Sequence, residues 1–182
     1  TMRATCITRC LILVYLLSML NLMSQAQQTA RFVNNWNIGE QVGISFNSGN
    51  PQNTPSSIDA YEVSTSFSDG YGNIICYSGN ASGLNQQVVF DANHLAMPNG
   101  DIYVDGSSSC GLTVVPKPGS CNQYYFFHLK STVLGWGLHY SMLDMNLAGN
   151  GSNTDPLGDI DPVEKDVLIY GDDALAEKIK VV

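Results

Sequence analysis

Apolar runs broken by glycine and proline turns extend along most of the chain, and the clearest pair lies between residues 110 and 130. Residues 112–115 and 124–129 are almost all β-branched, aromatic or leucine. Pro116, Pro118 and Gly119 separate the two runs and exclude a continuous helix. The pattern predicts a β-hairpin with a short, stiff connection.

Both arms of this hairpin are apolar on successive residues rather than on alternate ones. Such runs are typical of strands that are covered on both faces, as in stacked sheets or the inner strands of propeller blades. The same reasoning predicts further strands at residues 36–46, 62–68, 74–78, 87–91, 137–147 and 166–170. Residues 52–59 and the acidic stretch 155–162 are expected to be loops.

The predicted strands repeat. Residues 64–69, 74–77 and 88–91 correspond in type and order to residues 112–117, 124–127 and 139–144. We therefore expect an all-β fold of antiparallel, blade-like repeats, with units at about 61–100 and 111–170 and the start of a third unit at 174–182. Two units cannot close a ring of at least four blades, so we expect a partial β-propeller from the front of a longer protein.

The first 26 residues have the features of a secretory signal peptide. Arg3 and Arg9 precede an apolar run at residues 10–22 that ends in Ser24-Gln25-Ala26, and cleavage is expected after Ala26. A membrane anchor is the alternative, but the run of about 13 residues is shorter than the roughly 20 needed to span a bilayer. A polar leader at 27–35 and a propeller-like domain at 36–182 would follow.

Composition agrees with an exported β-protein. The chain is 44% apolar and 13% charged, with 17 glycines and a formal net charge of −8. Loss of Arg3 and Arg9 would leave six basic and sixteen acidic residues, a formal charge near −10. This balance argues against nucleic acid and anionic membranes as partners.

Three cysteines would remain after export: Cys76, Cys110 and Cys121. Cys110 and Cys121 flank the predicted hairpin turn, so a disulfide between them is a candidate, although the two are expected to be out of register. No cysteine or histidine spacing typical of zinc sites is present.

A set of short motifs, taken in order, resembles the amino-terminal β-propeller-like region of large Bacteroidota cell-surface proteins. The motifs lie at residues 36–51, 68–77, 97–100, 114–119, 124–127, 140–145 and 177–178. The resemblance implies a bacterial cell-surface location, with PKD or other immunoglobulin-like repeats and a gliding-motility-type or type IX secretion domain further along the polypeptide. It implies no catalytic residues.

Few residues suggest a catalytic or metal-binding role. His94, His128 and His139 each have a structural explanation, and the serines of residues 106–111 lack the Gly-x-Ser-x-Gly spacing. Asp91 and Asp144 occupy equivalent repeat positions, which favours turn capping.

Two candidate sites follow. Asp155, Asp159 and Asp161 offer oxygen ligands for Ca²⁺, with a solvated loop as the alternative. Trp36 and several tyrosines could stack on sugars, but strands favour aromatics in any case. Trp136 lies between two glycines, so we expect it in a loop, exposed, as a ligand contact.

The sequence thus favours a non-enzymatic, exported scaffold or recognition module of adhesion type. Its ligand would be extracellular, a polysaccharide or a protein. The alternative is an extracellular glycan-binding or glycoside-hydrolysing propeller whose site requires further blades.

Overall fold

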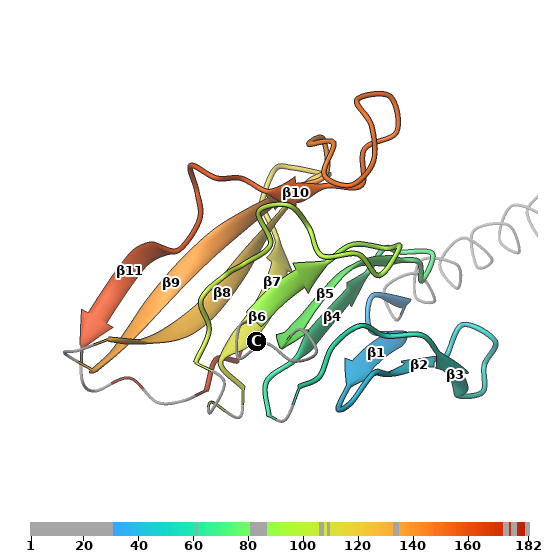
Figure 1. The fold of residues 1–182 in the computed structure, drawn as a ribbon, viewed down its shortest axis with the longest axis horizontal. Helices are drawn as coiled ribbons and strands as arrows, with labels where there is room; N and C mark the ends of the chain where they lie inside the picture. The colour runs from blue at the N-terminus through green and yellow to red at the C-terminus, as the bar shows by residue number, and fades with distance from the viewer. Residues whose placement is uncertain are drawn as a thin grey trace, which may run out of the picture.

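The computed structural model describes residues 31–60, 62–80, 87–105, 108, 110–132, 135–172, 175 and 178–180. These residues form an all-β protein of eleven strands in three antiparallel sheets, none of which closes on itself. The sheets follow one another in chain order, coloured blue, green and yellow to red in Figure 1. The predicted signal peptide lies outside the described residues. Within them, no helix is long and apolar enough to cross a membrane.

The first sheet contains β1 (Asn35–Ile38), β2 (Val42–Ser45) and β3 (Gln52–Thr54), in that order. The prediction of one strand over residues 36–46 was wrong, because the chain reverses between β1 and β2. Gly39 and Gln41 in this reversal have φ angles of 56° and 57°, in the left-handed region.

The prediction of a loop over residues 52–59 was also wrong at its start, since β3 pairs with the free edge of β2. Gly43 in β2 allows this pairing. A Cβ atom at Gly43 would lie 2.5 Å from Thr54 Oγ1 and 2.7 Å from the Thr54 carbonyl oxygen. The close backbone approach expected at this glycine is therefore present.

The second sheet contains β4 (Thr65–Ser68), β5 (Ile74–Asn80) and β6 (Gln87–Phe90). The predicted hairpin turn between β4 and β5 is present. Asp69 Oδ1 accepts hydrogen bonds from the backbone N–H groups of Tyr71 and Asn73, at 2.8 and 2.9 Å. Asp69 thereby fixes the reversal between the two strands.

The third sheet contains β7 (Leu112–Pro116), β8 (Gln123–Thr132) and β9 (Gly135–Asp144). Two further strands pair with the free edge of β9. β10 (Asp159–Ile160) pairs with one end of this edge, and β11 (Val167–Asp172) pairs with the other end. The predicted hairpin is therefore β7 and β8. The acidic stretch predicted as a loop contains β10, because Ile160 pairs with Leu143 and is fully buried.

The repeat between the second and third sheets extends to their turns. Asp91 follows β6, and its Oδ1 accepts the N–H of Asn93 at 2.8 Å. Asp144 ends β9, and its Oδ1 accepts the N–H of Asn146 at 2.8 Å. The predicted turn-capping role of both carboxylates is thus confirmed.

The main core lies between the second and third sheets. Val63, Cys76 and Val89 pack there against Leu112, Phe126 and Leu143, and the core also includes Met97, Ile102, Val104 and Ile160. A second cluster covers the opposite side of β5 and β6, where Ile58 and Ala60 pack against Tyr77, Val88 and Phe90. The second sheet is consequently buried on both faces.

The first strands of the three sheets lie in a row, with β1 beside β4 and β4 beside β7. Beyond β7, Lys178 forms a parallel bridge with Cys110, and the Ile179 N–H donates to the Cys110 carbonyl at 2.9 Å. Lys178 and Ile179, within the segment expected to begin a third unit, therefore lie beside Cys110, just before β7.

We predict that Phe126→Ala lowers the free energy of unfolding by about 3–5 kcal/mol, because Phe126 is fully buried between the two larger sheets. Urea denaturation monitored by circular dichroism measures this change. Leu95→Ala is the control, since Leu95 is 53% exposed and its loss should cost less than about 0.5 kcal/mol. Equal effects of the two substitutions would contradict this location of the core.

Candidate functional site

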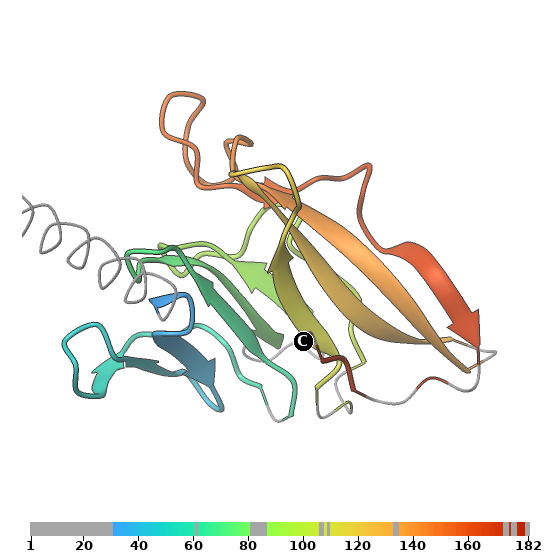
Figure 2. The same cartoon turned by 180° about the vertical axis from the view of Figure 1, so that it is seen from behind.

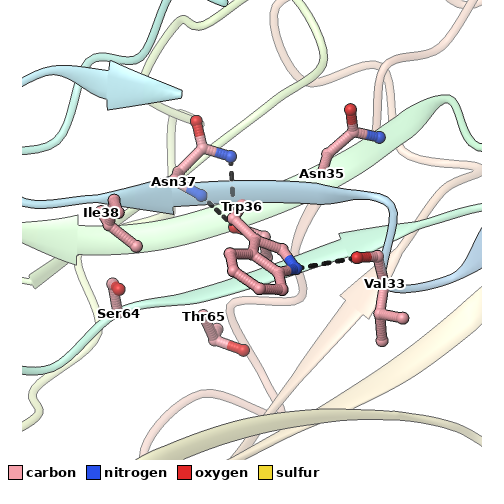
Figure 3. Close-up of a pocket in the computed structure, with 8 residues that line it drawn as sticks. Val33, Asn35, Trp36, Asn37, Ile38, Ser64 and Thr65 are labelled. Carbon is pink, nitrogen blue, oxygen red and sulfur yellow. Dashed lines mark hydrogen bonds between the residues drawn. The ribbon is translucent and has the colours of Figure 1, made fainter. Parts of the chain in front are cut away.

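A surface groove lies where β1 approaches β4, and its cavity has a volume of about 260 Å³. Both strands and the residues just before them contribute to it (Figure 3). The lining residues are Val33, Asn35, Trp36, Asn37, Ile38, Ser64, Thr65 and Ser66.

All four residues of β1 line the groove, and they alternate in burial along the strand. Asn35 and Asn37 are buried, whereas Trp36 and Ile38 are exposed, so the usual arrangement of apolar residues inside is reversed in this strand. In Figure 3 the two amides lie on one side of β1 and the indole of Trp36 lies on the other, toward Thr65.

The buried amides join the first sheet to the second. Asn35 Nδ2 donates to Ser68 Oγ at 2.9 Å and to the Gly72 carbonyl at 2.7 Å. The backbone N–H and Nδ2 of Asn37 both donate to Ser66 Oγ, at 2.9 and 3.1 Å. Side-chain hydrogen bonds therefore replace a regular backbone ladder between β1 and β4, which leaves space for the groove beside them.

Trp36 is held in place at two points. Its Nε1 donates to the Val33 carbonyl at 2.9 Å, and its ring lies 5.0 Å from the ring of Phe46, centroid to centroid. The side chain is nevertheless 49% exposed. The indole is thus a fixed aromatic surface open to solvent.

The polar atoms of the groove differ in whether they have a hydrogen-bond partner. Ser66 Oγ accepts from Asn37, but within the described part of the chain the hydroxyls of Ser64 and Thr65 have no hydrogen-bond partner. Asn37 Oδ1 is buried and also has none among those residues, and it points away from the indole in Figure 3. Two hydroxyls of the groove are therefore available to a ligand: that of Thr65, below the indole in Figure 3, and that of Ser64, below Ile38.

Among the described residues that line the groove, none carries an ionisable side chain. The groove can stack against an apolar surface and exchange hydrogen bonds, but it presents no acid and base pair of the kind that catalysis by proton transfer requires.

A second polar cluster lies inside the molecule, on the core side of β8 and β9. His128 is fully buried; its Nδ1 lies 2.9 Å from the Tyr103 carbonyl oxygen, and its Nε2 lies 3.2 Å from Ser141 Oγ. The Asp166 carboxylate approaches the same Nε2 at 3.5 Å. The His139 ring stacks on His128, with centroids 5.8 Å apart.

This cluster does not form a catalytic triad. In a triad the serine and the carboxylate contact different nitrogens of the imidazole, whereas here both lie at Nε2. Ser141 is also fully buried and accepts the Asp166 N–H at 2.9 Å. The cluster therefore connects β8, β9 and the segment before β11.

Burial lowers the pKa of His128 to about 4, because desolvation disfavours the charged imidazole more strongly than the Asp166 carboxylate favours it. His139 and Lys130 also oppose protonation, while the hydrogen bond to the Tyr103 carbonyl supports it. His128 is thus neutral at physiological pH.

His94 and His139 also have local partners. His94 Nδ1 lies 3.0 Å from the Tyr77 hydroxyl, and His139 Nδ1 lies 3.1 Å from the Gly137 carbonyl oxygen. These contacts agree with the structural explanations given to both histidines from the sequence.

The predicted calcium ligands are not gathered in one place. Asp159 is buried and accepts the N–H and Nδ2 of Asn99 at 3.0 and 2.7 Å, so it ties two loops together. Asp161 caps its own turn by accepting the Val163 N–H at 2.8 Å, and Asp155 is exposed. The part of the chain that the structure describes contains no group of three potential metal ligands. Calcium binding stays a prediction.

The other sequence candidates have different outcomes. Cys110 and Cys121 are free rather than joined. The five extended residues of β7 separate them by about 17 Å, beyond the reach of a disulfide. Trp136 belongs to β9, where it pairs with Ser131 and Asp172, so its assignment to a loop was wrong.

No protein-family model, curated protein or solved structure matches this chain. A function can therefore be inferred only from the sequence and from the contacts within the molecule.

The sequence pattern favours Trp136 over Trp36 as a ligand contact, and it does not indicate the groove. Ser64 and Thr65 lie almost thirty residues after Trp36, and only the approach of β4 to β1 brings them together. One local signal was present: Asn35-Trp36-Asn37-Ile38 alternates polar and apolar residues, but the sequence does not indicate which set is buried.

We predict that the free energy of unfolding falls as the pH is lowered from 6.5 to 4, by a contribution on the order of 3 kcal/mol from His128. The unfolded chain binds a proton at this residue near pH 6.5, whereas the folded protein binds it only near pH 4. The contribution is therefore complete above pH 6.5 and is lost below it. Urea denaturation across this pH range measures the effect.

His128→Asn keeps an amide donor near the Tyr103 carbonyl but does not titrate, so it should flatten the pH dependence. Leu95→Ala removes an exposed side chain that does not ionise and should leave the slope as it is. An unchanged slope in His128→Asn would rule out His128 as the source.

Proposed function

We propose that this chain is a non-enzymatic scaffold and recognition module of an exported cell-surface protein, with its sheets as consecutive blades of an incomplete β-propeller. The observation that carries the proposal is the apolar outer face of the third sheet, the face turned away from the core. Its partly buried residues are Val115, Tyr125, Phe127, Leu138 and Tyr140, and the buried Leu129 and Met142 lie on the same face.

Strand alternation separates this outer face from the core. Phe126 and Leu143 point into the core, so Tyr125, Phe127 and Met142 point the opposite way. The Tyr125 ring lies 5.8 Å from Phe127 and 5.5 Å from Tyr140, centroid to centroid. Figure 2 shows β8 and β9 with no second sheet in front of them.

An antiparallel sheet with one face in solvent normally has polar residues on that face. In the third sheet the polar residues His128, His139 and Ser141 lie on the core side, and the outer face is mostly aromatic and aliphatic. Such a face favours a further sheet packed against it, as the second sheet packs against the core side.

The position of residues 178–180 supports the same arrangement. They run parallel to the chain at Cys110, just before β7. In a propeller the first strands of successive blades surround the central axis. A following unit that begins here would lie against the outer face.

Export and location rest on the sequence. The amino-terminal pattern of residues 1–26 and the order of short motifs are the basis for proposing a secreted, Bacteroidota-type surface protein. Its partners would be further domains of the same polypeptide and an extracellular polysaccharide or protein.

The alternative function is a glycan-binding or glycoside-hydrolysing propeller whose site needs further blades. Hydrolysis of a glycoside normally uses two carboxylates on either side of the bond. If the protein is a non-enzymatic module, as proposed, the complete protein should show no turnover of chromogenic glycosides. Turnover that disappears on replacement of a single carboxylate would establish hydrolysis and refute the non-enzymatic proposal.

We further predict that the chain expressed without residues 1–26 self-associates through the outer face. Phe127→Thr combined with Tyr140→Thr keeps strand-forming residues but removes two aromatic rings, and it should raise the dissociation constant at least about tenfold. Sedimentation velocity over a range of concentrations measures this. Val163→Thr is the control, since Val163 is 84% exposed and lies outside the outer face. An unmodified chain that stays monomeric throughout would contradict the prediction.

A further inference from the structure

We infer that the groove between β1 and β4 binds a neutral sugar residue, which stacks on the indole of Trp36 and bonds to the hydroxyls of Ser64 and Thr65. The inference rests on the proposed recognition function and specifies its ligand class and its site. This site differs from the one that the alternative function places among further blades, because all its residues belong to the described chain.

The aromatic surface is already in position. The hydrogen bond from Trp36 Nε1 to Val33 and the contact with Phe46 fix the ring, yet 49% of the side chain is exposed. A ligand that stacks on it would not have to order a mobile side chain, so little binding energy is lost to conformational entropy. Tryptophan combines a large apolar face with a polar edge, which suits an amphipathic ligand.

The polar partners lie on the neighbouring strand. Ser64 and Thr65 line the same groove, and their hydroxyls are unoccupied within the described part of the chain. Each hydroxyl can both donate and accept a hydrogen bond. A pyranose ring has an apolar face of C–H groups and an edge of hydroxyls, so one ring can meet the indole and these hydroxyls together.

Charge argues for a neutral sugar. None of the lining residues that the structure describes is basic, so none could pair with a carboxylate, sulfate or phosphate. The chain as a whole carries a formal charge of −8, which would repel an anionic polysaccharide.

Size limits how much of the ligand is enclosed. The cavity of about 260 Å³ is slightly smaller than the roughly 300–1,000 Å³ of pockets that bury a drug-sized molecule. One sugar residue can occupy it, while the remainder of an oligosaccharide extends along the surface. Affinity from a single stacked ring should be modest, with dissociation constants of about 0.1–1 mM.

The test is isothermal titration calorimetry of the exported chain with four neutral probes: cellotetraose, xylotetraose, mannotetraose and tetra-N-acetylchitotetraose. Tetragalacturonate serves as the anionic comparison. We expect at least one neutral probe to bind saturably and tetragalacturonate not to bind. If no neutral probe binds up to about 10 mM, the inference is wrong.

Variants then locate the site. Trp36→Ala should weaken binding at least tenfold, Trp36→Phe should weaken it less, and Ser64→Ala combined with Thr65→Ala should weaken it severalfold without removing the ring. Tyr71→Ala is the matched control, because Tyr71 is a 69% exposed aromatic in the turn after β4. Circular dichroism of each variant verifies that the fold is retained.

Binding that survives Trp36→Ala but is lost in Trp136→Ala would overturn the inference and assign the ligand to β9 instead. The outcome is separable from that of the proposed function. Self-association through Phe127 and Tyr140 does not depend on Trp36. The sedimentation measurement therefore tests the proposed function whether or not a sugar binds.

Discussion

A three-stranded sheet with two apolar faces cannot cover both faces by itself, and this constraint governs the whole chain. The second sheet is stable because Ile58 and Ala60 cover one face and the third sheet covers the other. The connections contribute as well. Ile102 and Val104, in the segment between β6 and β7, fill the space between the sheets. Each unit therefore depends on its neighbours, as in repeat proteins.

The strands β4 to β9 and β11 could be predicted from sequence to within a few residues. Successive apolar residues in 112–115 and 124–129 gave β7 and β8, and the Asp69 turn gave the hairpin of β4 and β5. These features are local, since turn chemistry and strand patterning act over a few residues. The capping role of Asp91 and Asp144 was predictable for the same reason.

The errors came from contacts distant in sequence. β3 is short and polar and β10 has only two residues, and both are strands only because the edges of β2 and β9 are available to pair with them. The groove depends likewise on the side-chain bonds between β1 and β4, which link Asn37 to Ser66. No local pattern indicates that Asn35 and Asn37 are buried while Trp36 between them is exposed to solvent.

The polar cluster around His128 has a consequence for strand alignment. β8 and β9 pair over ten residues, so an alternative pairing displaced by one residue would preserve most of their backbone hydrogen bonds. Such slippage would turn one histidine toward the apolar outer face and leave the Tyr103 carbonyl and Asp166 without their partner. A buried polar group that has only one satisfactory location penalises every other alignment. The cluster thus gives a long, two-sided apolar hairpin a single native arrangement, which apolar contacts alone specify weakly.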